Sequence, residues 1–382
     1  MNEQIFTNAQ VVLADRIVNG SVVVRGGVIT AIGEGPSCLG SAIDCDGDLL
    51  IPGLVELHTD NMERHIMPRP GTFWPVASAI LNHDREIAAA GITTVFDALS
   101  VGMEDSGTLR TKLIGEFPTA IDELRGHGAL KADHRLHLRC EVSSEALLRQ
   151  LDALIGRPSV GLVSVMDHTP GQRQFVSLEK FGEYYKGKFA MSDAAFDAFA
   201  KGRIENSHRY SAPNRAAVVA IAAERGLRIA SHDDATLAHV EEAVRDGITI
   251  AEFPTTMDAA IASHRAGMGV LMGGPNIVRG GSHSGNIAAK DLAAAGVLDI
   301  ISSDYVPSSL LYGALLLAGA TVAVPLAKAI ALVTRNPARA AGLADRGEIA
   351  VGLRADLVRV KPGESDGVPV VRDVWRGGEK IA

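Results

Sequence analysis

The stretch Ile51-Pro-Gly-Leu-Val-Glu-Leu-His-Thr-Asp60 is an apolar run that ends in a histidine and a carboxylate two positions apart. Residues i and i+2 of a β-strand point to the same face, so we expect His58 and Asp60 to project together from the strand's carboxyl end. An imidazole and a carboxylate placed in this way are metal ligands. A strand end followed by an ordinary polar turn has the same pattern, so the rest of the chain must decide between the two.

Charge and cysteine content exclude several classes of protein. The 382 residues carry a formal charge of −8, whereas nucleic-acid binding relies on broad basic surface, so we expect no nucleic-acid partner. Cys38, Cys45 and Cys140 lack Cys-x-x-Cys spacing, which indicates neither a zinc ribbon nor a disulfide framework and favours a reducing compartment. The N-terminus has neither the basic start nor the apolar core of a signal peptide, so we expect a cytoplasmic protein.

One uncharged stretch, residues 308–327, is long enough to be considered as a membrane span. Gly313, Gly319 and Pro325 interrupt it, and the sequence has no second stretch of this kind. We therefore expect a buried helix of a globular domain here and no membrane partner.

Short apolar runs alternate with Ala-rich helical stretches along the middle of the chain, the pattern of βα units that close a parallel barrel. We expect strands at residues 53–58, 92–97, 135–141, 160–167, 227–232, 248–252, 269–272 and 298–303. Eight is the number of strands in a TIM barrel. The interval from His168 to Arg225 exceeds one helix, so it predicts an inserted excursion over the barrel mouth.

The two ends of the chain have the pattern of short strands. Asn19-Gly20 and Gly26-Gly27 separate apolar runs within residues 4–50, and both dipeptides are hairpin signals. Residues 347–360 and 368–374 also look like strands. We therefore expect an α/β protein with a (β/α)8 TIM barrel at residues 51–344 and a small β-sandwich domain that both termini form, at residues 1–50 and 345–382.

Imidazoles and carboxylates recur where the predicted strands end, which is where chemistry gathers in a (β/α)8 barrel. The candidate metal ligands are His58, Asp60, Glu141, His168, His232 and Asp304, and Glu252 closes the sixth strand. Any one of them alone is more often a hydrogen-bonded structural residue. Together they supply the ligands that Zn²⁺ and Mn²⁺ accept, so the sequence predicts a metal site at the barrel mouth.

The chain resembles the amidohydrolase superfamily over essentially its whole length. The resemblance rests on residues 50–60, Ser231-His-Asp-Asp234, Ser303-Asp304 and the tail from Asn336 to Val358. Residues 56–65, 68–71, 163–172 and 273–286 further resemble the phosphonate-degrading branch of the superfamily. This resemblance implies a (β/α)8 barrel of the amidohydrolase type and hydrolysis of α-D-ribose 1-alkylphosphonate 5-triphosphate to pyrophosphate and the 5-phosphate.

The resemblance also implies two divalent ions, expected to be Zn²⁺ with Mn²⁺ as the alternative, and Asp304 as the base that accepts a proton. The first strand offers His-x-Asp rather than the commoner His-x-His, and the sixth ends in Glu252 rather than histidine. Residues 163–168 contain no lysine that could be carboxylated to bridge two metals, so Glu141 is the expected bridge. Two roles stay open for Glu252: it binds a metal or it orients the substrate.

Basic and glycine-rich loops after two of the predicted strands are candidates for binding the triphosphate. Arg279, Ser282 and His283 follow the seventh strand among several glycines, and such a loop can cradle phosphate oxygens. Arg64, His65 and Arg69 follow the first strand. The alternatives are a flexible surface loop after the seventh strand and a solvated charged face after the first.

Two other functions have to be weighed against this interpretation. A cyclic-amide hydrolase of the hydantoinase or dihydroorotase kind shares the fold and the two-metal chemistry, but the missing lysine and the basic loops argue against it. A metal-free scaffold protein is disfavoured by the full set of candidate ligands. We expect the small ribosyl triphosphate as the partner of this protein, and a homo-oligomer as its assembly.

Overall fold

The computed structural model describes residues 3–103, 109–170, 173, 192–282, 285–320, 322–363 and 367–382. Eight parallel strands form one sheet in sequence order: β6 (Leu54–Thr59), β7 (Ile92–Val101), β8 (Asp133–Glu141), β9 (Val160–Met166), β10 (Arg228–His232), β11 (Ile250–Glu252), β12 (Gly269–Gly273) and β13 (Ile300–Ser302). An isolated parallel bridge between Thr59 and Asp304 joins the first strand to the end of the last. The sheet of the predicted (β/α)8 barrel is confirmed.

Burial explains why these segments are strands. All six residues of β6 are buried, as are all three of β11 and of β13. A parallel strand covered on both faces has a nearly continuous apolar sequence, and that is the pattern which located the strands in the chain. A polar residue inside such a run, like Glu56, therefore needs hydrogen-bond partners within the protein.

Helices follow the strands of the sheet. They are α1 (Met62–Ile66), α2 (Val76–Ala89), α3 (Leu109–Gly126), α4 (Leu147–Leu154), α6 (Asp193–Glu224), α7 (Leu237–Arg245), α8 (Met257–Arg265), α9 (Gly274–Val278), α10 (Ala289–Ala294), α11 (Ser309–Ala318), α12 (Leu326–Ala331) and α13 (Arg335–Ala340). Thr236 caps α7 by accepting a hydrogen bond from the backbone N–H of His239, and Thr256 caps α8 in the same way.

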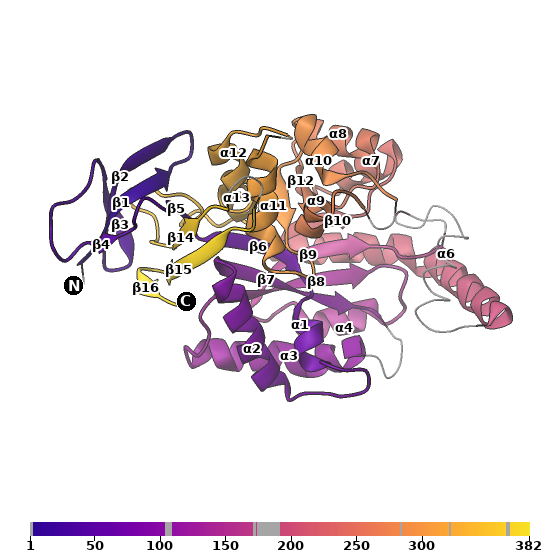
Figure 1. Ribbon diagram of the computed structural model, residues 1–382. Helices are drawn as coiled ribbons and strands as arrows, with labels where there is room; N and C mark the ends of the chain where they lie inside the picture. The colour runs from indigo at the N-terminus through magenta and orange to yellow at the C-terminus, as the bar shows by residue number, and fades with distance from the viewer. Residues whose placement is uncertain are drawn as a thin grey trace. The chain divides into compact units, whose positions relative to one another are not determined.

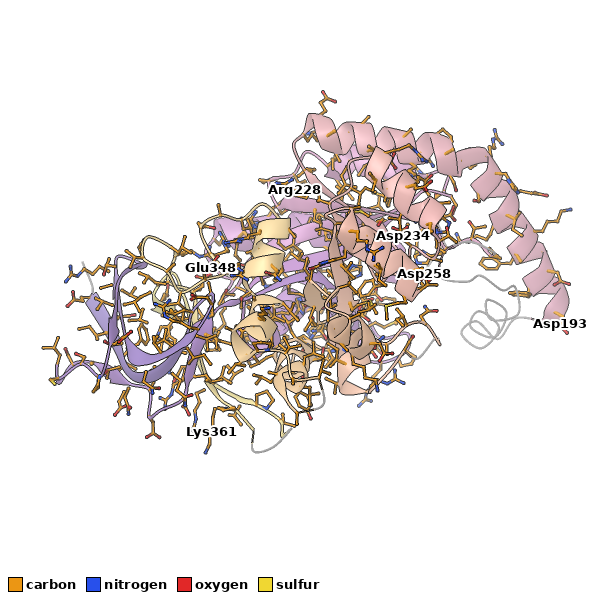
Figure 2. All side chains as sticks on the ribbon, turned by 90° about the horizontal axis from the view of Figure 1, so that it is seen from above. Asp193, Arg228, Asp234, Asp258, Glu348 and Lys361 are labelled. Carbon is orange, nitrogen blue, oxygen red and sulfur yellow. The ribbon has the colours of Figure 1, made fainter. Side chains whose placement is uncertain are left out.

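The predicted excursion between the fourth and fifth strands contains the 32-residue helix α6. Figure 2 shows this helix changing direction along its length from Asp193, and Pro213 inside it removes a backbone hydrogen bond, which is a cause of such bends. Residues 174–191 of the excursion lie outside the described residues. Its placement over the barrel mouth stays a prediction.

Strands from both termini meet, as the sequence predicted, in one separate sheet where a β-sandwich domain was expected (Figure 1). Its members are β1 (Glu3–Val12), β2 (Ile17–Arg25), β3 (Val28–Glu34), β4 (Ile43–Asp44), β5 (Leu49–Pro52), β14 (Leu357–Lys361), β15 (Val370–Arg376) and β16 (Glu379–Lys380). Strand β5 pairs with β1 on one side and with β14 on the other. Phe6 and Trp375, with ring centroids 4.8 Å apart, pack in the core of this sheet.

The chain divides into two compact units. Unit 1 contains Met1–Asp97, Ala120–Arg135 and Met272–Ala382, and unit 2 contains Ala98–Thr119 and Leu136–Leu271. The predicted domain boundaries near residues 50 and 345 stay predictions. Each unit is described by itself below.

Three strands are followed by a non-glycine residue in the left-handed region of backbone conformation. Asp233 follows β10 with φ +57°, Phe253 follows β11 with φ +52°, and Asp304 follows β13 with φ +54°. Such conformations cost energy and cluster at functional sites. They mark the carboxyl ends of these strands, where the candidate ligands lie.

The uncharged stretch at residues 308–327 contains the whole of helix α11 and the first two residues of α12. Six of the ten residues of α11 are buried in the protein. Within the described ranges, no helix combines the length and the apolar character that crossing a membrane requires.

Candidate functional site

In unit 1, the buried carboxylate of Glu56 ties the ends of β6 and β13 together. Its Oε1 accepts hydrogen bonds from the backbone N–H of His58 at 2.6 Å and from Ser302 Oγ at 2.8 Å. Its Oε2 accepts one from the backbone N–H of Ser303 at 2.5 Å. Burial raises the pKa of Glu56 to about 7, against the opposing effect of these hydrogen bonds. Glu56 therefore fixes the backbone on both sides of the strand ends that carry the predicted ligands.

Asp304 lies beside the end of β6. Its backbone carbonyl accepts hydrogen bonds from Thr59 Oγ1 at 2.6 Å and from the backbone N–H of Asp60 at 3.2 Å. Its backbone N–H donates to Ser302 Oγ at 3.2 Å. These three hydrogen bonds hold the backbone from which the Asp304 carboxylate projects. The structure thus brings the end of the first strand and the predicted base together within unit 1.

In unit 2, His168 and Glu141 form a buried pair. His168 Nδ1 donates to Glu141 Oε2 at 2.7 Å, and the backbone N–H of His168 donates to Glu141 Oε1 at 3.2 Å. Burial alone raises the pKa of a carboxyl group, but the hydrogen bond and charge of His168 outweigh it and lower the pKa of Glu141 to about 2. Because Nδ1 carries the proton, Nε2 is the imidazole atom of His168 that can bind a metal.

Helix α6 is hydrogen-bonded to the segment that follows Glu141. Asn214 Nδ2 donates to the backbone carbonyls of Val142 at 2.9 Å and of Ser144 at 2.7 Å, in the segment that directly follows Glu141. Asn214 is buried. The long excursion therefore supports a strand end that carries a predicted ligand.

His232 lies close to two carboxylates of unit 2. Its Nδ1 is 3.2 Å from Glu252 Oε2 and donates to it, so its Nε2 lone pair faces Asp233 Oδ2 at 3.4 Å. Asp233 Oδ2 is buried and has no hydrogen-bond partner among the residues that the structure describes. The ligand atoms of His168, His232 and Asp233 lie within 4.8 Å of one another. The lone pairs of His232 Nε2 and Asp233 Oδ2 thus face each other, and a divalent cation bound between them would satisfy both.

Asp233 is a candidate ligand that the sequence prediction missed, because only one residue was chosen at the end of each strand after the first, and His232 was chosen at the fifth. Burial raises the pKa of Asp233 to about 7, because the positive charges of His168, Arg139 and Arg173 only partly offset the loss of water around the carboxylate. The signal was present in Ser231-His-Asp-Asp234, where two carboxylates follow the histidine. Considering the residue after His232 as well would have found Asp233.

The predicted ligands are divided between the units. His58, Asp60 and Asp304 belong to unit 1, and Glu141, His168, His232 and Glu252 belong to unit 2. Within each unit the structure brings the respective members to neighbouring strand ends. Their convergence on one two-metal centre stays a prediction.

A second group with metal-ligand residue types, His83, Asp97 and His134, lies buried in unit 1. Its atoms already bind one another: His83 Nε2 is 2.7 Å from Asp97 Oδ1, and His134 Nδ1 is 2.7 Å from Asp97 Oδ2. His134 Nε2 donates to Asp84 Oδ1 at 3.2 Å, and Asp84 accepts from the backbone N–H groups of residues 131 and 132. This group is a hydrogen-bonded chain of side chains rather than a metal site. We call His83, Asp97, His134 and Asp84 the buried chain.

The buried chain predicts a pH dependence of stability. Burial alone lowers the pKa of an imidazole, but the charge of Asp97 and hydrogen bonds to Asp84 and Asp97 raise the pKa of His134 to about 9. A group whose pKa is raised by folding stabilises the protein fully below its unfolded pKa, near 6.5. This stabilisation is lost as the pH rises toward 9, by up to about 1.4 kcal/mol per pH unit.

We therefore expect the free energy of unfolding, measured in urea from pH 6 to pH 9.5, to fall more steeply in the wild-type protein than in His134→Gln. Groups that titrate in both proteins cancel in the difference between the two curves. Parallel curves would show that His134 has the same pKa in the folded and unfolded chains.

The predicted substrate-binding residues after β6 differ in their surroundings. Arg64 forms an ion pair with Glu86 on α2, and His65 Nε2 lies 2.8 Å from Glu86 Oε2. Arg64 and Arg69 are exposed and His65 is partly buried. The pairing with Glu86 was not foreseen, because it depends on how α1 packs on α2. It neutralises part of the positive charge that the sequence assigned to this loop.

The loop after β12 begins at the end of α9. Arg279 is the exposed residue that caps the carboxyl end of this helix, and Ser282 is partly exposed. His283 lies outside the described residues. The role of this loop in phosphate binding stays a prediction.

Comparisons with known proteins bear on the family of this chain. The amidohydrolase family model matches residues 84–381. The chain is 47% identical over 378 residues to alpha-D-ribose 1-methylphosphonate 5-triphosphate diphosphatase from Escherichia coli (strain K12), which covers 99% of this chain and 100% of the relative. It is 27% identical over 334 residues to imidazolonepropionase from Ruegeria sp. (strain TM1040), covering 82% of this chain and 78% of the relative.

Among solved structures, A. niger ochratoxinase has a similar fold, with a TM-score of 0.67 and 12% sequence identity over 100% of this chain and 95% of that chain. At this identity the likeness concerns the fold alone. The extent of the family match and the 47% identity decide the family. The chain belongs to the amidohydrolase family.

Proposed function

We propose that this protein is a metal-dependent hydrolase that removes diphosphate from α-D-ribose 1-alkylphosphonate 5-triphosphate and leaves the 5-phosphate, a step in phosphonate degradation. The observation that carries the proposal is the 47% identity over 99% of the chain to a relative whose name states this diphosphatase activity. The acidic strand ends and the exposed Arg279 are compatible with a metal-assisted reaction on a polyanion.

The proposed metal ligands are His58, Asp60, Glu141, His168, His232 and Asp304, for two divalent ions that we propose to be Zn²⁺. The orphaned Oδ2 of Asp233 supports adding this residue to the set. When bound, such an ion lowers the pKa of its coordinated water from 15.7 to roughly 7 and neutralises charge on phosphoryl oxygens. Oxygen and nitrogen ligands of this kind suit Zn²⁺, with Mn²⁺ as the alternative.

Asp304 is the proposed base. Its backbone is held at the end of β6 by Thr59 and Asp60, which fixes where the carboxylate can accept a proton from the attacking water. Glu252, which accepts a hydrogen bond from His232 Nδ1, holds that imidazole in the tautomer whose Nε2 can bind a cation. This contact favours a role for Glu252 in positioning His232. The substrate-binding role that the sequence left open for Glu252 is proposed in addition.

The loop after β12 is proposed to bind the outer phosphates through Arg279, Ser282 and His283, and the loop after β6 to contribute through Arg64, His65 and Arg69. Charge-assisted hydrogen bonds from an arginine to phosphate are worth ~1.5–3 kcal/mol. We expect Arg279→Ala to lower kcat/KM for the triphosphate roughly ten- to a hundredfold and to leave binding of the monophosphate product nearly unchanged. Steady-state kinetics and product titration measure the two quantities.

Two variants serve as controls for Arg279→Ala. Arg279→Lys should recover only part of the loss, because a point charge cannot reproduce the bidentate fork. Arg265→Ala, which removes an exposed arginine at the end of α8, should have no effect. Equal losses for substrate and product binding would place the phosphate cradle elsewhere.

Phosphorus NMR of the products from a ribosyl 1-methylphosphonate 5-triphosphate tests the proposed function. The expected products are diphosphate and the 5-phosphate, formed only with divalent metal present. Release of single phosphates would show that a different phosphoanhydride bond is cleaved. Ring opening of hydantoin without diphosphate release would replace the proposal by a cyclic-amide hydrolase.

A further inference from the structure

Asn61 directly follows the predicted ligand Asp60 and is 2% exposed. Its backbone N–H donates to Thr59 Oγ1 at 3.3 Å, and the same hydroxyl donates to the backbone carbonyl of Asp304 at 2.6 Å. One hydroxyl group therefore joins Asn61 to the backbone of the proposed base. The side chain of Asn61 was not among the residues that the sequence pattern singled out.

The orientation of the Asn61 amide is determined by its neighbours. Nδ2 lies 3.0 Å from Glu86 Oε2 and 3.0 Å from His83 Nδ1. A carboxylate accepts hydrogen bonds only, so the NH₂ group must face Glu86. The opposite amide orientation would place two acceptors against each other. His65 Nε2 also lies 3.4 Å from Nδ2, but it donates to Glu86 Oε2 at 2.8 Å and so is not an acceptor. The second amide hydrogen therefore goes to His83 Nδ1, which must be an acceptor.

The buried chain fixes the tautomer of His83 from its other side. With Nδ1 accepting from Asn61, His83 carries its hydrogen on Nε2 and donates to Asp97 Oδ1 at 2.7 Å. Asp97 Oδ2 accepts from His134 Nδ1 at 2.7 Å, and His134 is anchored in turn on Asp84. Every member is buried, so no water competes for these hydrogen bonds. The donor and the acceptor of each hydrogen bond are therefore fixed along the whole buried chain.

The remaining atom of the Asn61 amide has no such partner. Oδ1 is buried, and nothing in the described ranges donates a hydrogen bond to it. A buried acceptor without a donor is unfavourable, and such an atom calls for an explanation such as a bound ligand. It lies on the residue next to Asp60, at the strand end where metal and substrate are expected.

We propose that Asn61 Oδ1 accepts a hydrogen bond from the bound ligands, through a substrate hydroxyl or a metal-bound water. His83 is the positioning residue that keeps this oxygen directed away from Glu86, and the rest of the buried chain keeps His83 in the required tautomer. The identity of the substrate in this inference rests on the proposed function. The orientation of the Asn61 amide rests only on the hydrogen bonds described above.

A double-mutant cycle on the metal-loaded enzyme tests the coupling between Asn61 and His83. We expect Asn61→Ala to lower kcat/KM at least about tenfold, and His83→Leu to cause a similar loss. If His83 acts through Asn61, the double variant loses no more than Asn61→Ala alone. His83→Gln, which again offers an acceptor and a donor, should recover most of the activity. Additive losses, or equal losses for Leu and Gln, would overturn the positioning role.

Measurements of metal content and substrate affinity show whether the hydrogen-bond donor to Asn61 Oδ1 is a metal-bound water or a substrate hydroxyl. Loss of bound metal in Asn61→Ala, by elemental analysis at limiting Zn²⁺, assigns the contact to metal-bound water. A raised KM with full metal content assigns it to a substrate hydroxyl. Unchanged metal content together with unchanged kcat and KM would overturn the proposal. Asp258→Asn, at an exposed position on α8, is the control.

The tautomer of His83 is measured on the wild-type protein. This test therefore still applies if a variant fails to fold or if the proposed activity is absent. Long-range ¹H–¹⁵N correlation spectra at pH 7.5 should show His83 as a neutral imidazole with hydrogen on Nε2, and His134 as an imidazolium. Hydrogen on Nδ1 of His83 would overturn the inference, because that nitrogen could not accept from Asn61.

Discussion

Asp304→Asn is expected to lower kcat about a hundred- to ten-thousandfold, the range that removal of a general base causes. Asparagine matches aspartate in size and tolerates the left-handed backbone conformation, φ +54°, that Asp304 adopts. The hydrogen bonds of the residue to Thr59, Asp60 and Ser302 involve its backbone only. The variant therefore keeps the strand end and loses the proton acceptor.

Metal content must be measured in the same preparation, because Asp304 is also a proposed ligand. Restoring full occupancy with excess Zn²⁺ should leave kcat low if Asp304 is the base. Asp304→Ala should in addition lower the melting temperature, since alanine tolerates positive φ less well than asparagine. Near-normal turnover with full metal would reassign the base, and Glu252 would be the next residue to replace.

The fold could be predicted because buried parallel strands leave a continuous apolar signal. Each predicted strand overlaps an observed one, from β6 to β13. Of the two hairpin dipeptides, Gly26-Gly27 correctly marked the turn between β2 and β3. The prediction for Asn19-Gly20 was wrong, because these residues lie inside β2 and pair with Gln10 and Ala9 of β1. An apolar run of strand length is a local feature of the sequence, so it can be recognised without knowing the rest of the fold.

The supporting residues of the site could not be predicted in the same way. Glu56 contacts Ser302 and Ser303, which are almost 250 positions away in the chain. Its position inside an apolar run was visible, but its partners depend on which strand end lies beside β6. Only the meeting of the ends of β6 and β13, seen in the bridge between Thr59 and Asp304, brings them together.

The buried chain shows the same limit. His83 lies on α2, Asp97 on β7 and His134 on β8, and nothing in their spacing indicates that they meet. A helix histidine among apolar residues is ordinarily an isolated core residue. Its partners become apparent only when the packing of α2 against the strands is known.

His168→Ala is expected to remove at least one equivalent of bound metal and to lower kcat/KM more than roughly a hundredfold. Loss of a group that merely orients a ligand already costs 10–100-fold in metal affinity, and His168 is proposed to bind directly. Its Nδ1 is committed to Glu141, so Nε2 is the atom available for the metal, and alanine supplies no replacement. Elemental analysis and steady-state kinetics measure the two effects.

Two comparisons make this result specific. His127→Ala, which removes an exposed histidine just after α3, should change neither quantity. His168→Ala also leaves the carboxylate of Glu141 without its imidazole partner, so the pKa of Glu141 should rise and the variant should lose stability even without metal. If metal-free His168→Ala is as stable as the metal-free wild type and binds metal normally, His168 is neither a ligand nor the partner that keeps Glu141 charged. The ligand set would then have to be rebuilt around His232 and Asp233, whose facing lone pairs do not depend on His168.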